Sequence, residues 1–266
     1  MPSPLPVGGH TVETDGSFPG LLCAFADAHR FGTLPASVAL AGAARTGGLF
    51  GPPRRVATDV ELADRVERRL EVRAPGLVSK LFRAVLSERP GIEVAALRLA
   101  AEVVGRGPGA ADDWTFEPAR DVARWAQRVG RERHRMEAFV RFEKHTDGAS
   151  ERWLAHSRPE HHVLPLLHTH FVARYPALSW TILDVRRHLA LVHTPAREGR
   201  EAATRIVPAT SLGELMLADD ETAYQRMWRA YFQAVDIPER RNLTLHLRHV
   251  PKRYWPYLTE KQDELA

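Results

Sequence analysis

The sequence is poor in cysteine, and this scarcity excludes several kinds of site. Cys23 is the single cysteine among 266 residues. The chain therefore has no intrachain disulfide and no site that needs several thiolates, such as a cysteine-held iron–sulfur cluster or an all-cysteine zinc site. Cys23 lies in the apolar run 21–25, which predicts a small buried side chain and gives no support to a nucleophilic role.

Long hydrophobic runs are absent as well. No window reaches the roughly 18 consecutive apolar residues of a membrane-spanning helix. Residues 1–10 contain proline and glycine instead of the basic and apolar stretches of a secretory signal. With 44% hydrophobic and 26% charged residues, the composition is that of a globular protein. We expect a soluble, intracellular protein, placed in the cytoplasm, with no membrane partner.

Lysine is rare, although the chain is basic. Four of the 37 basic residues are lysines, so the rest are arginines, and the net charge is +4. Arginine is the better bidentate partner for phosphate. This balance permits an acidic partner such as nucleic acid but does not require one.

The usual signatures of hydrolases and cofactor enzymes are also missing. The sequence contains no GxSxG elbow, no HExxH helix, no Rossmann glycine pattern and no GxxxxGK[ST] phosphate loop. We therefore expect no cofactor, and the sequence leaves open whether the protein is an enzyme.

Apolar stripes at helical spacing fill much of the first half. Residues 32–57 lack such a period and are rich in glycine, proline and alanine, which predicts an irregular loop, and whether it orders on binding stays open. We interpret residues 1–136 as a helical N-terminal part. The first predicted helix begins near residue 21. Further helices are predicted over residues 58–70, 77–86, 92–104 and 117–136.

Beyond residue 136 the apolar period changes from helical to alternating. The pattern predicts an α+β protein with a mostly helical N-terminal half, a central antiparallel sheet with an inserted helix, and a helical C-terminal segment. Residues 137–266 form its second part, and we expect a single compact unit overall. The predicted strands cover residues 139–144, 152–156, 180–185, 188–193 and 204–207, with a turn at Asp147-Gly148 and helices over 163–175 and 217–235.

Several histidines cluster before and within the helix predicted over 163–175. Histidine is the commonest metal ligand, but His168 and His170 stand two residues apart, so on a helix they point to different sides. Asp184 precedes two arginines, which favours a charge-paired turn residue over a general base. We assign no metal site. The candidate acid, base or metal-binding groups of an enzyme are His161, His162, His170 and Asp184.

Basic residues interleaved with aromatic residues form the stronger pattern. Guanidinium and ammonium groups neutralise phosphates, while tyrosine and tryptophan faces stack on bases. Three clusters qualify, within residues 131–141, 186–187 and 240–255, and each is also compatible with a solvated face over a core aromatic. The candidate nucleic-acid-binding residues are Arg133, Arg135, Arg141, Arg240, Arg241, Lys252, Arg253, Tyr254 and Trp255.

Several separated motifs together resemble one bacterial family. They are DGSF at 15–18, HRM at 134–136 with FVRF at 139–142, PEHHVLPL at 159–166 with HF at 170–171, WRAYF at 228–232, IPERRN at 237–242 and VPKRYW at 250–255. The family is the domain of unknown function described as a probable DNA metabolism protein. The chain departs from its usual pattern at His162, where members often carry aspartate, and at Val250, where methionine is common.

The resemblance implies a partner role linked to DNA. Members accompany a radical-SAM protein of DNA modification or repair, and in other genomes the domain is fused to a uracil-DNA-glycosylase-like domain. Our first hypothesis is an accessory DNA-binding or partner-presenting protein, with DNA and the radical-SAM protein as partners. The alternative is a nucleic-acid-processing enzyme, metal-dependent or not, that uses the His161–His170 region. In a third hypothesis the helical first half or the aromatic stripe 224–232 docks the radical-SAM partner, although such a stripe is more often core.

Overall fold

The computed structural model describes residues 5–42, 52–146, 150–213, 216–235 and 243–264. Its contacts divide the chain into two compact units, unit 1 (1–130) and unit 2 (131–266), where a single unit was expected from the sequence. The boundary falls within helix α5 (Glu117–Phe139), close to the expected boundary at residue 136.

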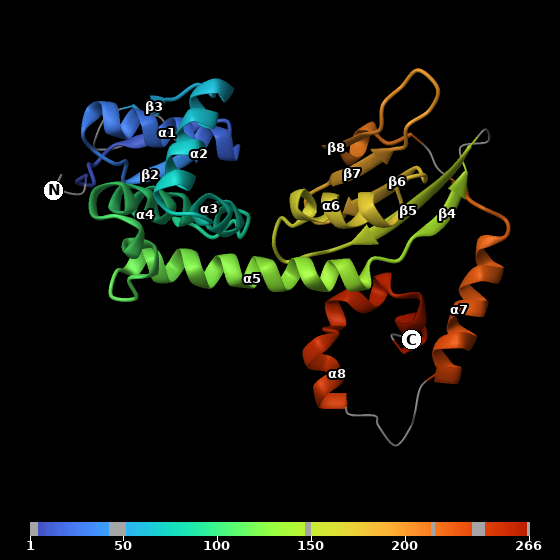
Figure 1. Cartoon of the computed structure of the whole chain (residues 1–266). Helices are drawn as coiled ribbons and strands as arrows, with labels where there is room; N and C mark the ends of the chain where they lie inside the picture. The colour runs from blue at the N-terminus through green and yellow to red at the C-terminus, as the bar shows by residue number, and fades with distance from the viewer. Residues whose placement is uncertain (1–4, 43–51, 147–149, 214–215, 236–242, 265–266) are drawn as a thin grey trace. The chain divides into compact units, whose positions relative to one another are not determined.

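Unit 1 is mostly helical, as predicted (Figure 1). Ser17 caps the N-terminus of helix α1, because its side chain accepts a hydrogen bond from the Gly20 amide at 3.0 Å. Asp59 caps α2 in the same way and accepts from the Leu62 amide at 3.0 Å. Besides the first part of α5, its helices are α1 (Phe18–Phe31), α2 (Val60–Arg73), α3 (Leu77–Val85), α4 (Ile92–Arg106) and the 3₁₀ helix η1 (Pro108–Asp112).

A small parallel sheet corrects the prediction of an irregular loop over residues 32–57. Strands β2 (Ser37–Leu40) and β3 (Arg54–Arg55) lie within that segment and pair on either side of β1 (Thr11–Thr14). Strands of two to four residues are too short to show an alternating period. Residues 43–51 lie outside the described residues.

One continuous apolar cluster forms the core of unit 1. It contains the inward faces of α1 to α4, and the side chains of Leu99 and Val122 are fully buried. Cys23 belongs to this cluster, with 1% of its surface exposed, which confirms the buried position expected for it.

Unit 2 is built on a six-stranded mixed sheet with the strand order β8-β7-β6-β5-β4-β9. The pair β5–β6 is parallel and the other pairs are antiparallel, so the expected antiparallel pairing is wrong at this one pair. The inserted helix explains the difference, because a helical crossover returns the chain in the same direction. The strands are β4 (Glu143–Thr146), β5 (Glu151–Ser157), β6 (Trp180–Asp184), β7 (Leu189–Thr194), β8 (Ala203–Pro208) and β9 (Met216–Leu217).

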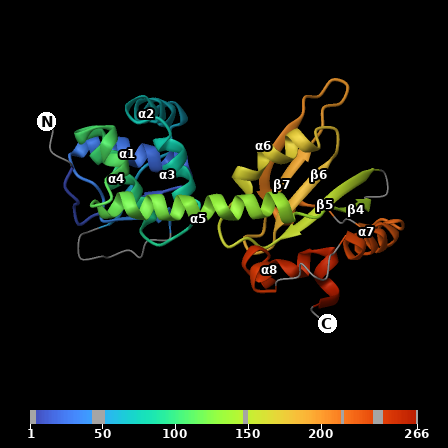
Figure 2. The same ribbon diagram turned by 60° about the horizontal axis from the view of Figure 1, so that its bottom comes forward.

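Helices of unit 2 cover the sheet and complete the chain. Helix α6 (Leu164–Arg174), the predicted inserted helix, packs on one face of the sheet (Figures 1 and 2). Helix α5 continues to Phe139, so the strand expected over 139–144 begins only at Glu143. The turn predicted at Asp147-Gly148 lies outside the described residues. The remaining helices are η2 (Ala209–Ser211), α7 (Glu221–Val235), α8 (Leu243–His249), η4 (Lys252–Tyr257) and η5 (Thr259–Glu264).

A helix that crosses a lipid bilayer must be both long and apolar. Within the described ranges, no helix combines sufficient length with sufficient apolar character to do so.

Candidate functional site

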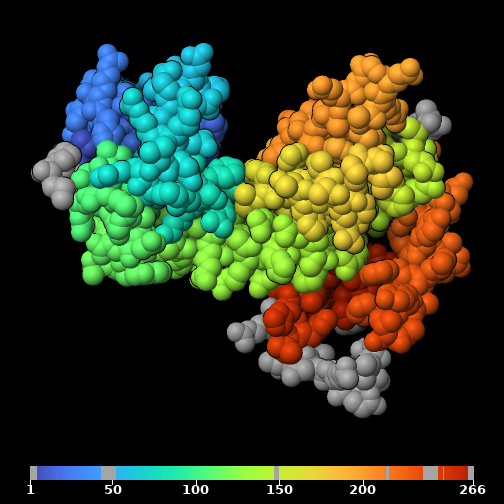
Figure 3. Space-filling view, in the orientation of Figure 1, coloured from blue at the N-terminus to red at the C-terminus, as the bar shows by residue number. Residues whose placement is uncertain are grey.

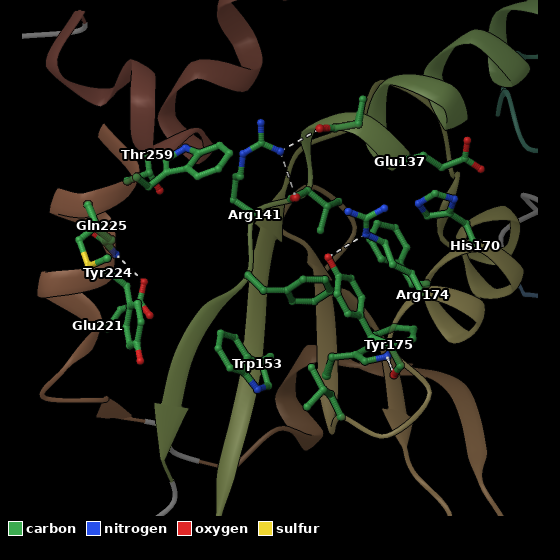
Figure 4. Close-up of a pocket in the computed structure, with 18 of the residues that line it drawn as sticks. Glu137, Arg141, Trp153, His170, Arg174, Tyr175, Glu221, Tyr224, Gln225 and Thr259 are labelled. Carbon is green, nitrogen blue, oxygen red and sulfur yellow. Dashed lines mark hydrogen bonds between the residues drawn. The ribbon is translucent and has the colours of Figure 1, made fainter. Parts of the chain in front are cut away.

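A cavity of about 930 Å³ opens in unit 2 between the sheet and helix α7 (Figure 4). This volume falls within the range of about 300–1,000 Å³ that is typical of sites for small organic ligands. We call it the aromatic pocket. The rings that line its floor belong to Phe142, Trp153, Phe171, Tyr175 and Trp180.

The floor of the aromatic pocket is a packed group of rings around Trp180. The Trp180 ring centre lies 5.9 Å from that of Phe171 and 6.1 Å from that of Phe142. Its indole N–H donates to the carbonyl oxygen of Tyr175 at 3.2 Å, so its polar atom is satisfied although only 1% of the residue is exposed. The floor is therefore in place before any ligand arrives.

His193 supports Trp180 from behind. The two rings are stacked, with centres 5.0 Å apart and planes 22° apart. His193 Nε2 lies 3.2 Å from the carbonyl oxygen of Pro176, which can only accept, so Nε2 donates. In the neutral ring Nδ1 then accepts from the Thr204 hydroxyl at 2.7 Å. The two hydrogen bonds fix the orientation of the ring beneath the pocket.

Helix α7 forms the opposite wall and presents its aromatic side to the cavity (Figure 4). Tyr224 is 55% exposed, Tyr231 58% and Met227 68%. Polar residues such as Glu221 and Arg229 lie on the side that contacts the rest of unit 2. A surface helix normally buries its apolar side, and in the space-filling view α7 lies at the edge of unit 2 with much of its surface open (Figure 3). Its aromatic side is therefore available to a ligand.

The N-terminal end of α7 is held by a buried carboxylate. Glu221 is 4% exposed and accepts hydrogen bonds from the Lys144 amide at 2.8 Å and from the Gln225 side chain at 3.2 Å. The Lys144 ammonium pairs with Glu151 at 2.8 Å and with Asp220 at 3.1 Å. These two carboxylates raise the pKa of Lys144 above its ordinary value. One lysine thus connects β4, β5 and the start of α7.

The middle of α7 is held by Glu260 of η5. Its carboxylate accepts from the Arg141 guanidinium and from the Trp228 indole N–H, both at 2.9 Å. Burial alone would raise the pKa of Glu260, but these two donors lower it below its usual range. The rings of α7 therefore stand on a helix that is tied down at two places.

Positive charge lies at the rim of the aromatic pocket. The Arg174 guanidinium is exposed, donates to the Tyr175 hydroxyl at 3.0 Å and lies 5.5 Å from the centre of that ring. Among the described residues no carboxylate pairs with Arg174. Glu137, which also lines the pocket, pairs with Arg133 at 3.3 Å. Arg174 is therefore a cation of the pocket that is free to meet an anionic group.

Residues 90–260 match the family described as a domain of unknown function, DUF4130. The chain belongs to this family. The matched range contains the whole lining of the aromatic pocket, so the pocket is part of the DUF4130 domain. No curated protein and no solved structure matches the sequence at a significant level.

Most of the basic residues singled out in the DUF4130 sequence pair with carboxylates. Glu132, whose side chain is 2% exposed, lies 3.7 Å from Arg135 and 3.2 Å from Arg253, and Arg253 also lies 3.6 Å from Glu160. Arg133 and Arg141 pair with Glu137 and Glu260, as described above. These arginines form an ion-pair network within unit 2, which leaves less of their charge available for phosphates.

The aromatic candidates near the C-terminal end are buried. Tyr254 is 2% exposed and its hydroxyl accepts from Arg253 at 2.7 Å, while Trp255 is 6% exposed and donates to the Val250 carbonyl oxygen at 3.0 Å. Neither ring presents a face to a ligand, so the stacking platform expected there is absent. Lys252 is exposed, whereas Arg240 and Arg241 lie outside the described residues.

The histidine candidates do not converge. His161 is 5% exposed, His162 half-buried and His168 exposed, while His170 lines the aromatic pocket. Over the part of the chain that the structure describes, no three His, Cys, Asp or Glu residues are placed to hold a metal ion.

Asp184 lies at the end of β6 and is fully buried. One carboxylate oxygen accepts from the amides of Arg186 at 3.0 Å and Arg187 at 3.2 Å, and the other pairs with the Arg187 guanidinium at 2.8 Å. This arrangement agrees with the interpretation of Asp184 as a charge-paired turn residue.

Sequence reasoning missed the residues on the floor side of the aromatic pocket. Trp153 and Trp180 stand opposite each other in the register of β5 and β6, which is visible only once the strands are paired. Arg174-Tyr175 is a basic and aromatic pair that the pattern used for the three clusters would have found.

Proposed function

We propose that the chain is an accessory protein of DNA repair or modification, which binds DNA through the aromatic pocket and works beside a radical-SAM protein. One observation carries the DNA-binding part: exposed rings of α7 face a floor of packed rings, with Arg174, which has no described carboxylate partner, at the rim (Figure 4). The radical-SAM partner rests on the resemblance of the sequence motifs.

Stacking is the interaction that this pocket offers best. A base inserted between two aromatic surfaces gains about 1–3 kcal/mol per stacked ring, largely independent of its identity. Tyr224 and Tyr231 are both more than half exposed, so they can contact a base without displacing other side chains. A paired base inside a duplex has no free face, which favours single-stranded DNA or an unpaired base.

The guanidinium at the rim complements stacking. Arg174 has no described carboxylate partner, and its planar group suits a phosphate oxygen pair. Phosphate contacts release counterions, so binding should weaken as the salt concentration rises.

A fluorescence-anisotropy titration tests the proposal with labelled single- and double-stranded oligonucleotides at several salt concentrations. The variant Tyr224→Ala/Tyr231→Ala should weaken single-strand binding by about 1–3 kcal/mol for each lost stack. Trp114→Ala is the matched control, because Trp114 is a 67% exposed aromatic residue of unit 1. It should bind like the unaltered protein.

A charge reversal separates stacking from phosphate contact. Arg174→Glu should weaken binding and flatten the dependence of affinity on salt, whereas the tyrosine variant should leave that slope unchanged. Absence of binding at low salt, or equal losses in the tyrosine variant and the Trp114→Ala control, would contradict the proposal.

A further inference from the structure

A second cavity, of about 440 Å³, lies at the end of the sheet where β7 leads into β8. Arginines and hydroxyl-bearing residues line most of it, and we call it the arginine pocket. Its arginines are Arg152, Arg197, Arg200 and Arg205, and its hydroxyl groups come from Ser150, Ser179, Thr181 and Thr194. Glu201 is its one carboxylate among the described lining residues.

The strand register places several residues of the arginine pocket on the face of the sheet opposite Trp180. Thr181, Val192 and Arg205 are partners across β6, β7 and β8. Side chains alternate between the two faces of a strand, so Thr181 points away from the face on which its neighbour Trp180 lies. Trp180 and its partner His193, which lie on the other face, also line the arginine pocket, so the two cavities share Trp180.

A tight turn brings two of the arginines together. The amide of Arg197 donates to the carbonyl oxygen of Arg200 at 3.0 Å, and the amide of Arg200 donates back at 2.9 Å. Gly199, with a φ of 74°, supplies the left-handed backbone of the two-residue turn. Residues paired in this way carry their side chains on the same side. The two side chains therefore leave the turn on the same side, and both line the arginine pocket. Like charges placed in this way disfavour each other unless an anion joins them.

The arginines of unit 2 fall into two groups. Arg135, Arg141 and Arg253 each pair with a carboxylate, as shown above. In contrast, Arg197, Arg200 and Arg205 make no ion pair with any residue that the structure describes, although all three line one cavity. Unpaired guanidinium groups next to hydroxyl donors form a surface complementary to a small multivalent anion.

We propose that the arginine pocket binds a phosphate group. Planar guanidinium groups match pairs of phosphate oxygens, and hydroxyl groups supply further donors. The phosphate belongs to a free phosphate compound or to a nucleic-acid backbone, and both sources present the same chemistry. The inference does not depend on the aromatic pocket, because phosphate alone tests it.

The test uses the full chain in low-salt buffer and three probes: inorganic phosphate, a nucleoside monophosphate and a labelled single-stranded oligonucleotide. ³¹P line broadening follows the first two probes and anisotropy follows the third. The variant is Arg197→Glu/Arg200→Glu. The control is Arg158→Glu/Arg226→Glu, which changes the net charge equally at two exposed arginines that line neither pocket.

We expect saturable binding of inorganic phosphate that weakens at least tenfold in the variant and less than twofold in the control. Arg205→Lys keeps the charge but loses the planar fork, so an intermediate loss supports bidentate contact. Competition between inorganic phosphate and the oligonucleotide, lost in the variant, assigns the site to a nucleic-acid backbone. Binding of the monophosphate without such competition assigns it to free phosphate compounds.

Two outcomes would overturn the inference. One is the absence of saturable binding of every probe, and the other is an equal loss in the variant and the control. The variant residues are exposed, so circular dichroism should show an unchanged fold. If Tyr224→Ala/Tyr231→Ala abolishes oligonucleotide binding while phosphate binding persists, the two sites are independent.

Discussion

Unit 1 and unit 2 differ in what they bury and in what they leave exposed. Among the described residues, four polar or charged side chains are buried in unit 1 and ten in unit 2. The core of unit 1 is one apolar cluster. Both units expose large apolar residues, but in unit 2 four that are more than half exposed lie on the single helix α7, namely Tyr224, Met227, Tyr231 and Val235. Apolar burial stabilises without regard to direction, while buried polar groups must find partners at defined positions. The positions of buried side chains are therefore fixed more closely in unit 2 than in unit 1.

The family match sharpens this difference. It covers residues 90–260, which include almost all of unit 2 but only the last part of unit 1. The shared domain thus contains the polar network, both pockets and the exposed rings. Each of the following substitutions changes one buried or exposed residue that contributes to the difference between the two units.

The largest effect is expected at Asp184. Asp184→Ala removes a fully buried carboxylate, and with it the 2.8 Å ion pair to the Arg187 guanidinium and the hydrogen bonds from the amides of Arg186 and Arg187. Breaking a buried ion pair in this way costs about 3–5 kcal/mol. Hydrogen exchange followed by mass spectrometry should show lost protection in peptides of unit 2 and unchanged protection in unit 1. Equal loss in both units would show that they do not unfold separately.

Truncation of a core residue tests the contribution of apolar burial to the stability of unit 1. Leu99 is fully buried in the apolar cluster, so Leu99→Ala should cost about 2–5 kcal/mol of unfolding free energy. Guanidinium denaturation measures this loss. Val72→Ala is the control, because Val72 is 85% exposed and its truncation should change stability by less than about 0.5 kcal/mol.

A smaller effect is expected at Glu260, and it depends on pH. Because the pKa of Glu260 is lowered in the folded protein, its contribution to stability is complete above the unfolded pKa of about 4.3 and is lost as pH falls through the folded pKa. Glu260→Gln should cost about 1.5–3 kcal/mol at neutral pH. Unfolding curves from pH 7 to pH 3 should show a shallower loss for this variant. A parallel curve would contradict the assignment.

Local sequence patterns predict most of the helices and strands, but they predict the pairing of the strands only in part. The stripes in 58–70 and 92–104 suffice for α2 and α4, because burial of one face repeats every turn. The helix between the strands at 152–156 and 180–185 was predicted, but the parallel pairing that its crossover allows was not. The strands β1 to β3 carry too few residues for any period to be visible.

Exposure could not be predicted from the same patterns. Tyr224 and Tyr254 both occur in aromatic, helix-compatible stretches, yet one is 55% and the other 2% exposed. The difference arises from contacts distant in sequence, such as the anchoring of α7 by Glu260 and Lys144. The paired state of Arg253 likewise depends on Glu132, far away in the chain. Residue type led to the prediction of a nucleic-acid partner, but it could not show which of the candidate side chains are exposed and which are paired.

The smallest effect on stability is expected at Tyr231. It is 58% exposed, so Tyr231→Ala should change the unfolding free energy by less than about 0.5 kcal/mol. Tyr254→Ala, in the same unit, removes a buried ring and should cost about 3–5 kcal/mol, as comparable core aromatics do. Thermal unfolding of both variants measures the contrast. A large loss at Tyr231 would mean that the rings of α7 stabilise unit 2, and the aromatic pocket would then be a packing defect instead of a binding site.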